Sequence, residues 1–433
     1  MLYGFNQSNM NPYRSHRLFL FLPIALLSAS AGCSKSSTSS GPSISVAVNA
    51  GVEGDGIKAA AMRYEALKHV KIEISELPYN NLYSKVLLSA SNPTSPFDVV
   101  MLDDPWFPKF ASMGALEPLT PHYRKAGLSG PDDDFVAASI ALGRQPYGTG
   151  ELFALPVVGN CQMFFYRQDL LEAAQLRVPV RSWQEVMDYS RKLMSEGRVP
   201  FGFVIRGEKG NPIVVESMPI FWAFGAKMFD GDKVTVDTPQ ARKALQFLID
   251  LKAVSPPGVE NFNADQVANH LLQNKAAMAI SWPAWIGAME DPAQSKVVGK
   301  MGYSVMPGAD MPGASVIGNW LLAVPKTSAN KDLAFDFVKW LTDASQQRQN
   351  ALEAGNPPTR VSIFKDPELI KTHPFYPAQL EALLHSSPRP RTPDWMEIEN
   401  NYGIYLSQAL SGILTPAQAL AQAQKEISQI AKP

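Results

Sequence analysis

Two adjacent carboxylates and a tryptophan follow a short apolar run, FDVVML, at residues 97–102. The run predicts a parallel strand that is buried on both faces. Ligands of open α/β sheets bind just beyond the carboxyl ends of strands, which makes Asp103, Asp104 and Trp106 candidate ligand contacts. Carboxylates at this place accept hydrogen bonds or face a cation, and an indole stacks on an apolar surface. Alternatively, Asp104 caps the following helix, with Pro105 at its first position.

A third acidic residue is expected at the same sheet edge. Residues 43–49 alternate in hydrophobicity as a strand does, and Glu53 lies in the segment GVEGD that follows. Because carboxyl ends of parallel strands share an edge, Glu53 should lie near Asp103. Alternatively, Glu53 only favours the N-terminus of the next helix, which Asp55 would cap.

Two amides stand in the stretch LPVVGNCQMFFYR. If the stretch is extended, Asn160 and Gln162 point to one face and Cys161 to the other. Amides both donate and accept hydrogen bonds, which suits a ligand rich in hydroxyl groups. In the alternative, they satisfy backbone groups of the same stretch.

The tryptophans divide into two groups. Three of them follow strand-like runs in loop contexts and are candidate stacking residues: Trp282 and Trp285 in SWPAW, and Trp320 beside the candidate contact Asn319 in GNW. Trp222, in IFWAFG, is a candidate as well, although a helical stripe there would serve core packing equally. Trp183 has capping-box neighbours and Trp340 lies in an apolar helical pattern, so both are predicted to be core residues.

The elements that position these residues read as strand, helix, strand, helix, strand over residues 43–102. Apolar residues repeat with helical spacing over 57–67 and 82–90, and with period two over 70–74. Short crossovers of this kind require right-handed βαβ units and a parallel sheet. The fold class is therefore α/β.

Composition limits the function classes. The chain has 433 residues, enough for two lobes, and a formal net charge of −1 with 18% charged residues. It shows no basic stripe, so nucleic acid is not an expected partner. The sequence lacks the motifs HExxH, GxSxG, GxxxxGK[ST] and the EF-hand loop, and the six histidines have no ligand spacing. We expect no catalytic residues, no metal and no cofactor. Asp132-Asp133-Asp134 reads as a helix start.

The N-terminus has the pattern of a secretory signal. Residues 1–32 contain Arg14 and Arg17, no acidic residue, and an apolar run over 18–27 that is too short to span a bilayer. Ser30-Ala31-Gly32-Cys33 resembles the lipobox of bacterial lipoproteins, with Ser30 where leucine is usual. The resemblance implies cleavage before Cys33, lipidation of Cys33 and a membrane anchor, whereas an ordinary secretory signal is the alternative. Residues 33–43 are a flexible tether by composition. Cys161 would then have no disulfide partner.

Several segments, in this order, resemble landmarks of the family 1 extracellular solute-binding proteins, the sugar receptors of ABC importers. They are FDVVMLDDPWFPKFASMGALEPL, ELFALPVVGNCQMFFYRQDLLE, NKAAMAISWPAW, GNWLLAVPKTSANKDLAFDFVKWLT and GNPPTR. The resemblance covers nearly all of the mature chain. It implies a two-lobed periplasmic-binding-protein fold of type II, with a sugar held in the cleft and no chemistry done. It further implies a monomer outside the cytoplasm that delivers a mono- or oligosaccharide to permease subunits.

The crossings between lobes divide the chain. We expect a first lobe of residues 44–156 and 281–328, and a second lobe of residues 157–280 and 329–433. The rigid turn GNPPTR can deliver Arg360 to the cleft, where relatives often place a polar contact. Arg389 and Arg391 alternate with prolines in an extended stretch and are predicted to be structural.

Two other functions stay open. One is a lipid-anchored glycoside hydrolase that uses Asp103 with a partner such as Glu53. Adjacent Asp103 and Asp104 cannot easily form the required pair, because hydrolysis needs carboxyl groups about 5 to 9.5 Å apart across the bond. The other is a receptor for a charged solute such as a polyamine, in which the same acids act as counter-charges.

Overall fold

The structure is a computed structural model that describes residues 41–92, 94 and 96–431, which form one compact unit. The expected signal peptide, the lipidation site Cys33 and residues 33–40 of the expected tether lie outside the described residues. Ser43, which we expected to end the tether, already belongs to the first strand. In the described part of the chain, no helix has the length and apolar character needed to span a membrane.

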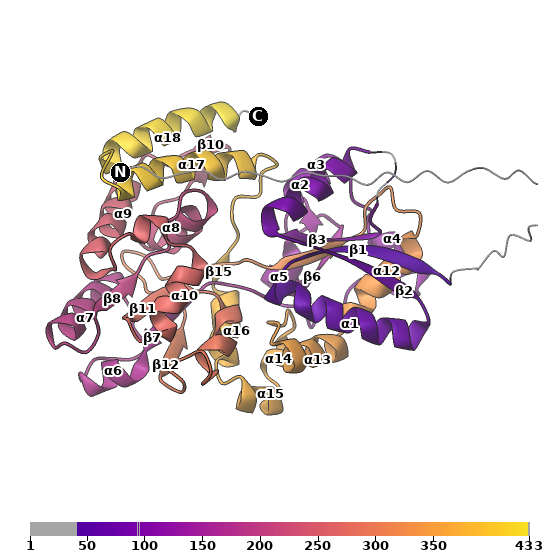
Figure 1. The fold of residues 1–433 in the computed structure, drawn as a ribbon. Coiled ribbons are helices and arrows are strands. Elements are labelled where there is room, and N and C mark those ends of the chain that lie inside the picture. The colour runs from indigo at the N-terminus through magenta and orange to yellow at the C-terminus, as the bar shows by residue number, and fades with distance from the viewer. Residues whose placement is uncertain (1–40, 93, 95, 432–433) are drawn as a thin grey trace, which may run out of the picture. The chain divides into compact units, whose positions relative to one another are not determined.

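The first sheet has five strands in the order β2-β1-β3-β14-β6. Figure 1 labels β1, β2, β3 and β6 of this sheet. The strands β1, β2 and β3 are parallel, and β14 runs antiparallel to both β3 and β6. Helices α1 (Val52–Lys68) and α2 (Tyr79–Ala90) connect the parallel strands, which confirms the predicted βαβ units. The five strands are β1 (Ser43–Asn49), β2 (Lys71–Leu77), β3 (Val99–Asp103), β6 (Ala154–Val158) and β14 (Trp320–Ala323).

The second sheet has four strands in the order β12-β7-β11-β8. Its central pair, β7 and β11, is antiparallel, and β11 runs parallel to β8. The run predicted as a strand before Trp282 is β11. The four strands are β7 (Met163–Arg167), β8 (Phe201–Val204), β11 (Ala276–Ser281) and β12 (Met301–Ser304).

The other elements are short strands and the helices that cover the sheets. The short strands are β4 (Arg144–Gln145), β5 (Glu151–Leu152), β9 (Phe229–Asp230), β10 (Lys233–Val234), β13 (Ser315–Val316) and β15 (Ser386–Ser387). The helices are α3 (Phe107–Ser112), α4 (Thr120–Lys125), α5 (Ala137–Ala141), α6 (Gln168–Ala173), α7 (Trp183–Ser195), α8 (Asn211–Ala223), α9 (Pro239–Asp250), α10 (Ala264–Leu272), α11 (Ile286–Met289), α12 (Lys331–Leu341), α13 (Ala344–Ala354), α14 (Val361–Phe364), α15 (Pro367–Thr372), α16 (Tyr376–Leu384), α17 (Trp395–Leu410) and α18 (Pro416–Ile430).

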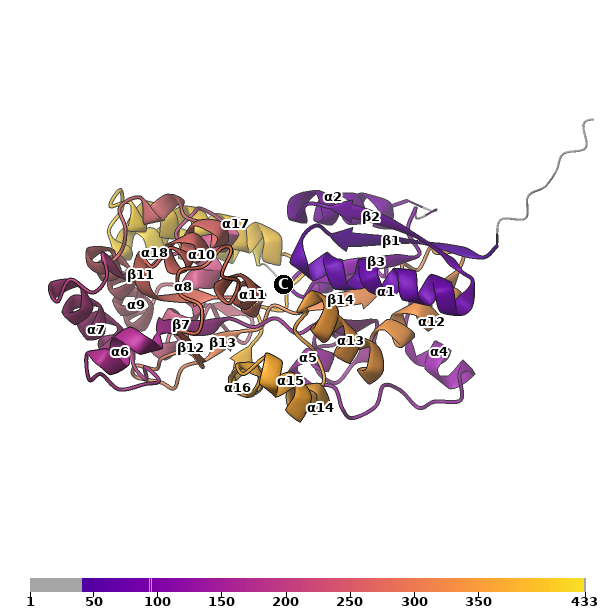
Figure 2. The same ribbon diagram turned by 60° about the horizontal axis from the view of Figure 1, so that its bottom comes forward.

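One hydrophobic core covers the first sheet and extends to one face of the second sheet, with Met163, Phe165 and Ala279. A second core lies on the other face of the second sheet, with Phe164, Tyr166 and Met278. Packing and strand pairing differ from the expected lobe boundaries in two places. Helices α12 and α13 pack on α1 in the first core, although residues 329–433 were expected in the second lobe (Figure 2). Strand β12 pairs with β7 in the second sheet, although it was expected in the first lobe. An apolar stripe or a strand pattern shows that an element buries one face, but it does not select the sheet that covers this face.

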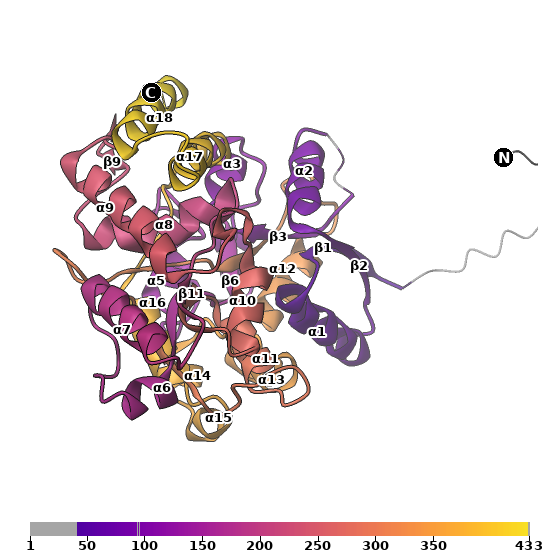
Figure 3. The same cartoon turned by 60° about the vertical axis from the view of Figure 1, so that its left-hand side comes forward.

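Helices α17 and α18 lie side by side over the second core and pack near α8 and α9 (Figure 3). Residues 416–430 form α18. The capping box of α7 is also confirmed, since Ser182 and Glu185 cap each other's backbone and Trp183 is fully buried.

Two predicted helix starts are wrong. The acidic run 132–134 lies in a turn, and the next helix, α5, begins only at Ala137. The carboxyl group of Asp104 does not cap α3, whose N-cap residue is Trp106 and has no side-chain cap. In both places the acidic side chains bind arginine residues that are distant in the sequence.

Two segments link the sheets and run side by side, and we call them the crossing segments (residues 159–162 and 317–319). Cys161 and Ile317 form a β-bridge, and the Gly318 N–H donates to the Asn160 carbonyl at 2.9 Å. Cys161 is a free, buried cysteine, and burial raises the pKa of its thiol. A third link, residues 386–394, joins α16 to α17, and we call it the strap.

Candidate ligand-binding cleft

A cavity of about 1640 Å³ is lined by the ends of strands and helices from both cores. It exceeds the roughly 300–1,000 Å³ that is usual for small-molecule sites. Its lining mixes carboxylates, amides, guanidinium groups and aromatic rings. Among the lining residues are Asn49, Glu53, Tyr79, Asp103, Asn160, Tyr166, Arg206, Asn211, Trp282, Trp285, Tyr303, Trp320, Phe375, Arg389 and Glu399.

Six of the predicted contacts line this cavity: Glu53, Asp103, Asn160, Trp282, Trp285 and Trp320. Glu53 and Asp103 follow neighbouring parallel strands, as the strand-end argument requires. Gly54 allows this arrangement, because a Cβ atom at this position would lie only 2.1 Å from the Asn49 carbonyl oxygen. The start of α1, and Glu53 with it, is thereby packed closely against the end of β1.

Asp103 and Asp104 have different surroundings. Asp103 lines the cavity and accepts a hydrogen bond from the Tyr79 hydroxyl at 2.7 Å. Asp104 is fully buried and lies outside the lining, in contact with the guanidinium groups of Arg389 and Arg391. Consecutive residues at a strand end project to different sides, so the sequence does not decide which one meets the ligand.

Trp106 does not line the cavity. Its side chain is fully buried, with ring-centroid distances of 4.6 Å to Tyr79 and 5.7 Å to Trp320. Trp106 therefore supports the aromatic residues that do line the cavity.

Three further candidates also lie outside the lining. Gln162 is buried in the crossing segment, and the Asn319 side chain donates to the Ser139 hydroxyl at 2.7 Å. Both amides are buried in the crossing segments, and the Gln162 side-chain oxygen has no hydrogen-bond partner among the described residues, so its alternative role of satisfying backbone groups stays a prediction. Trp222 is half-buried on α8 and borders a separate small pocket near Met228.

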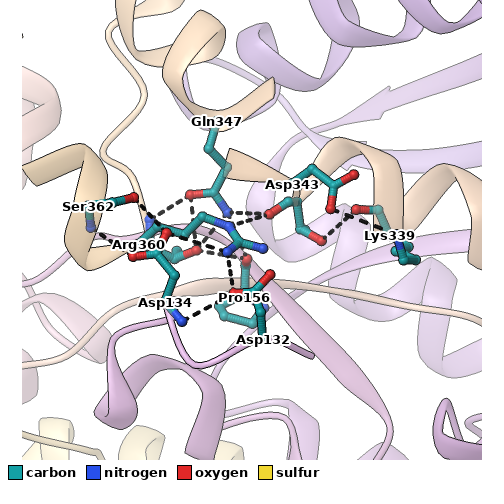
Figure 4. A network of polar contacts seen from close by, with 10 residues as sticks. Asp132, Asp134, Pro156, Lys339, Asp343, Gln347, Arg360 and Ser362 are labelled. Carbon is teal, nitrogen blue, oxygen red and sulfur yellow. Dashed lines mark hydrogen bonds and ion pairs between the residues drawn. The ribbon is translucent and has the colours of Figure 1, made fainter. Parts of the chain in front are cut away.

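Arg360 was expected in the cleft and is instead buried within the first core (Figure 4). Its guanidinium donates to the Thr342 carbonyl at 2.7 Å and to Asp132 at 2.6 Å, and it stacks over the Phe135 ring at 3.9 Å. The turn after α13 thus directs Arg360 inward, where it ties the C-terminal end of α12 to the loop before α5.

Arg389 is the main residue that the sequence did not reveal. It was predicted to be structural, yet it lines the cavity and donates to both oxygens of Asp103, at 3.1 and 2.8 Å. Only the strap's closeness to the end of β3, 286 residues away along the chain, brings this pair together. The alternating prolines signal an extended strap but not its docking place.

Other cleft residues were also missed, on both walls. Tyr79 begins α2, whereas Arg206, Asn211 and Glu399 come from the second core. The Arg206 guanidinium donates to the Asn263 amide oxygen at 3.0 Å and to that of Asn211 at 3.4 Å, and the Asn211 amide donates to Glu399 at 2.9 Å. Tyr79 and Asn211 lie at helix starts, Arg206 lies in a loop and Glu399 lies within α17, and a single polar residue at any of these places carries no periodic signal.

Burial dominates the electrostatics of the cleft. It raises the pKa of Glu399 to about 7 and that of Asp104 to about 6, although Arg389 opposes both shifts. It also raises the pKa of the Glu53 carboxyl and of the Tyr79 hydroxyl. Tyr79 therefore stays a hydrogen-bond donor to Asp103 at neutral pH.

The arrangement suits reversible binding of a polar molecule. Asp103 is held from two sides by Tyr79 and Arg389, and the indoles of Trp282, Trp285 and Trp320 add apolar surface beside these polar groups. Polar groups fixed in this way orient a bound ligand, and aromatic faces provide the area that contacts its apolar parts.

The sequence pattern of the bacterial extracellular solute-binding protein family matches residues 50–348. A protein of Sinorhizobium fredii, named as a probable amino-acid ABC transporter periplasmic-binding protein, is 29% identical over 92% of this chain and 91% of its own. The mannitol-binding protein of Pseudomonas aeruginosa is 29% identical over 65% of this chain and 69% of its own.

Among solved structures, the maltose-bound MalE3 protein of T. maritima superposes with a TM-score of 0.81. It is 26% identical and covers 90% of this chain and 100% of its own. The two-lobed fold predicted from the sequence is thereby confirmed. The family consists of substrate-binding proteins rather than enzymes, and its members act outside the cytoplasm. With the match extending over residues 50–348, this chain belongs to the bacterial extracellular solute-binding protein family.

Proposed function

We propose that this protein binds a neutral sugar or sugar alcohol in its cleft and delivers it, unchanged, to an ABC importer. The observation that carries the proposal is the pairing of a fixed carboxylate with aromatic walls: Asp103, held by Tyr79 and Arg389, beside Trp282 and Trp320. The carboxylate accepts hydrogen bonds from the hydroxyl groups of the ligand, and the indoles contact the side of the ligand that carries its C–H groups. The mannitol and maltose named for two of its relatives are ligands of this chemistry.

A thermal-shift panel of sugars, sugar alcohols, amino acids and polyamines tests the ligand class. A ligand that binds only the folded state raises the free energy of unfolding, by about 2.7 kcal/mol when its concentration is 100 times Kd. The melting temperature Tm rises as a result. We expect a shift with at least one sugar or sugar alcohol and none with polyamines. Shifts confined to amino acids or polyamines would overturn the proposal.

An amino acid is the second candidate ligand. The guanidinium of Arg206 lines the cleft and donates to two amide oxygens, so it keeps its positive charge available for a ligand carboxylate. The Sinorhizobium relative carries amino-acid transport in its name. Arg206→Gln should abolish binding of an amino acid, whereas a neutral sugar should lose only the one or two hydrogen bonds that Arg206 donates.

Binding without turnover is part of the proposal and separates it from glycoside hydrolysis. Prolonged incubation of purified protein with a disaccharide should release no reducing sugar beyond a protein-free control. Release that disappears in Asp103→Asn would point to hydrolysis instead.

We also propose that the protein is a monomer anchored to the membrane by lipid on Cys33, which keeps it near its permease. Cys33→Ser should move the protein from the membrane fraction to the soluble fraction. An unchanged distribution would refute the anchor without affecting the binding proposal.

A further inference from the structure

Gly318 lies in the second crossing segment, just before β14, and lines the cleft together with Trp282. A Cβ atom at position 318 would lie 2.6 Å from Cζ3 and 2.8 Å from Cη2 of Trp282. Carbon atoms attract each other at about 3.5–4.0 Å, so these distances are strongly repulsive. The indole of Trp282 therefore occupies the space that any side chain at position 318 would need.

The backbone around Gly318 is held in place. The Gly318 N–H donates to the Asn160 carbonyl at 2.9 Å, and the Asp104 N–H donates to the Asn319 carbonyl at 3.1 Å. The Asn319 side chain is fully buried on Ser139. Trp282, in contrast, is half-buried, and its side chain turns about two bonds. An added methyl group at position 318 would thus displace the indole rather than the crossing segment.

Two further aromatic residues of the same cavity are also held in place. Tyr79 and Trp320 line the same cavity, with ring centroids 5.9 Å apart and ring planes at 86°. Trp106 packs directly against both rings, and Tyr83 packs between Trp106 and Phe110, so these two rings are fixed as well. Aromatic rings held in fixed positions favour a ligand that has a rigid apolar face.

We propose that Gly318 determines ligand specificity by seating Trp282, and that the seated indole selects a cyclic sugar over an open-chain sugar alcohol. The inference rests on the proposed function. A pyranose presents a preformed C–H face, whereas an open chain has to lose conformational freedom before it covers the same area. Gly318 acts through Trp282 and is a positioning residue.

The test compares Gly318→Ala, Trp282→Phe and the double variant, using titration calorimetry with maltose and mannitol. Gly318→Ala should weaken maltose binding about five- to tenfold, the loss expected for a displaced aromatic contact. Mannitol binding should change less. The double variant should bind maltose no more weakly than Trp282→Phe alone, because the two changes act on one contact.

Acrylamide quenching of tryptophan fluorescence measures how accessible the Trp282 indole is, without any ligand. Gly318→Ala should increase quenching relative to the wild type, and in the Trp282→Phe background it should not. Gly202→Ala is the matched control, because its Cβ would lie 2.1 Å from the Ser190 Cβ in the second core, away from the cleft. That variant should lose stability and keep its Kd.

Two outcomes would overturn this inference but not the proposed function. In the first, the wild type binds maltose and Gly318→Ala leaves the Kd unchanged. In the second, the losses of maltose affinity from the two single changes add up in the double variant. A wild type that binds mannitol but no cyclic sugar would overturn the ring selectivity. A wild type that binds neither sugars nor sugar alcohols would overturn the proposed function as well.

Discussion

Asp103 has two roles, since it is a proposed ligand contact and also forms hydrogen bonds within the protein. Its carboxylate lines the cavity, and the neighbouring lining residues Tyr79 and Arg389 donate hydrogen bonds to it. Such a carboxylate is preorganised, because its orientation needs no further ordering when the ligand arrives. The side chain is 8% exposed, so a ligand hydroxyl that loses this acceptor has little water to replace it.

Asp103→Asn should therefore weaken binding of the ligand about ten- to a hundredfold, the equivalent of about 1.5–3 kcal/mol for a hydrogen bond to a charged group. Titration calorimetry measures the change in Kd. The surface variant Asp332→Asn, whose side chain is 61% exposed, is the control and should leave Kd unchanged. Equal Kd values for Asp103→Asn and the wild type would show that Asp103 serves the fold alone.

Glu216 makes the fold sensitive to pH. It is fully buried in α8, and burial raises the pKa of its carboxyl to about 8 against the opposing charge of Arg206. Between about pH 4.5 and 8, the folded protein keeps a proton that the unfolded chain has lost. Stability should consequently fall as pH rises through this window, by up to about 1.4 kcal/mol per pH unit for this group.

Glu216→Gln should remove this contribution, so the variant gains free energy of unfolding relative to the wild type from pH 5 to pH 8. Urea denaturation at several pH values measures the two slopes. Exposed Glu208, in the segment before α8, provides the control Glu208→Gln, which should keep the wild-type slope. Identical slopes for Glu216→Gln and the wild type would contradict the prediction.

At the scale of elements, the strap is bound to the end of β3 in the first sheet by its two arginine residues. Arg389 pairs with Asp103 and Asp104, and Arg391 donates to the carbonyls of Asp104 and Leu142. Both guanidinium groups are nearly buried, with side-chain exposures of 3% and 11%. The strap thereby connects α17, which belongs to the second core, to the end of β3 in the first.

Replacing Arg389 by Met should lower the free energy of unfolding by about 3–5 kcal/mol, because two neighbouring buried carboxylates lose their shared cation. Urea denaturation measures the loss. Arg242→Met is the matched control: Arg242 pairs with Asp237 at 2.6 Å on the surface, and the loss of this exposed ion pair should change the free energy of unfolding far less. Equal losses in the two variants would argue against the strap's electrostatic role.

At the scale of the whole molecule, a cleft lined from two cores suggests that binding changes the arrangement of the lobes. A ligand shifts an equilibrium toward a closed form only when it binds that form more tightly. Transport requires such a difference, because the importer has to recognise the loaded receptor.

A saturating ligand should reduce the radius of gyration in small-angle X-ray scattering and change tryptophan fluorescence. Trp320→Phe should alter the fluorescence change, since Trp320 lines the cleft. Trp340→Phe should not, because Trp340 packs against Tyr64 in the first core, at a centroid distance of 5.1 Å. Identical scattering with and without ligand would refute closure even if the binding proposal holds.

Much of the fold follows from local patterns. The alternating run 43–49, the helical spacing of 57–67 and the apolar run before Asp103 correspond to β1, α1 and β3 in a parallel arrangement. These patterns are informative because side-chain periods of 2 and 3.6 reflect which faces an element buries. Strand-end geometry then placed Glu53 and Asp103 correctly at the cleft, and the tryptophans after strand-like runs lie there too.

Tertiary structure decided which polar side chains face the ligand. Asp104 and Arg360 have the residue types and positions of ligand contacts, but they lie in the cores because Arg389, Asp132 and the Thr342 carbonyl meet them there. Arg389 lies in the cleft because it pairs with Asp103, which is 286 positions away in the sequence. A buried charge is stable only beside its partner, and pairs so distant in the sequence leave no periodic signal in either segment.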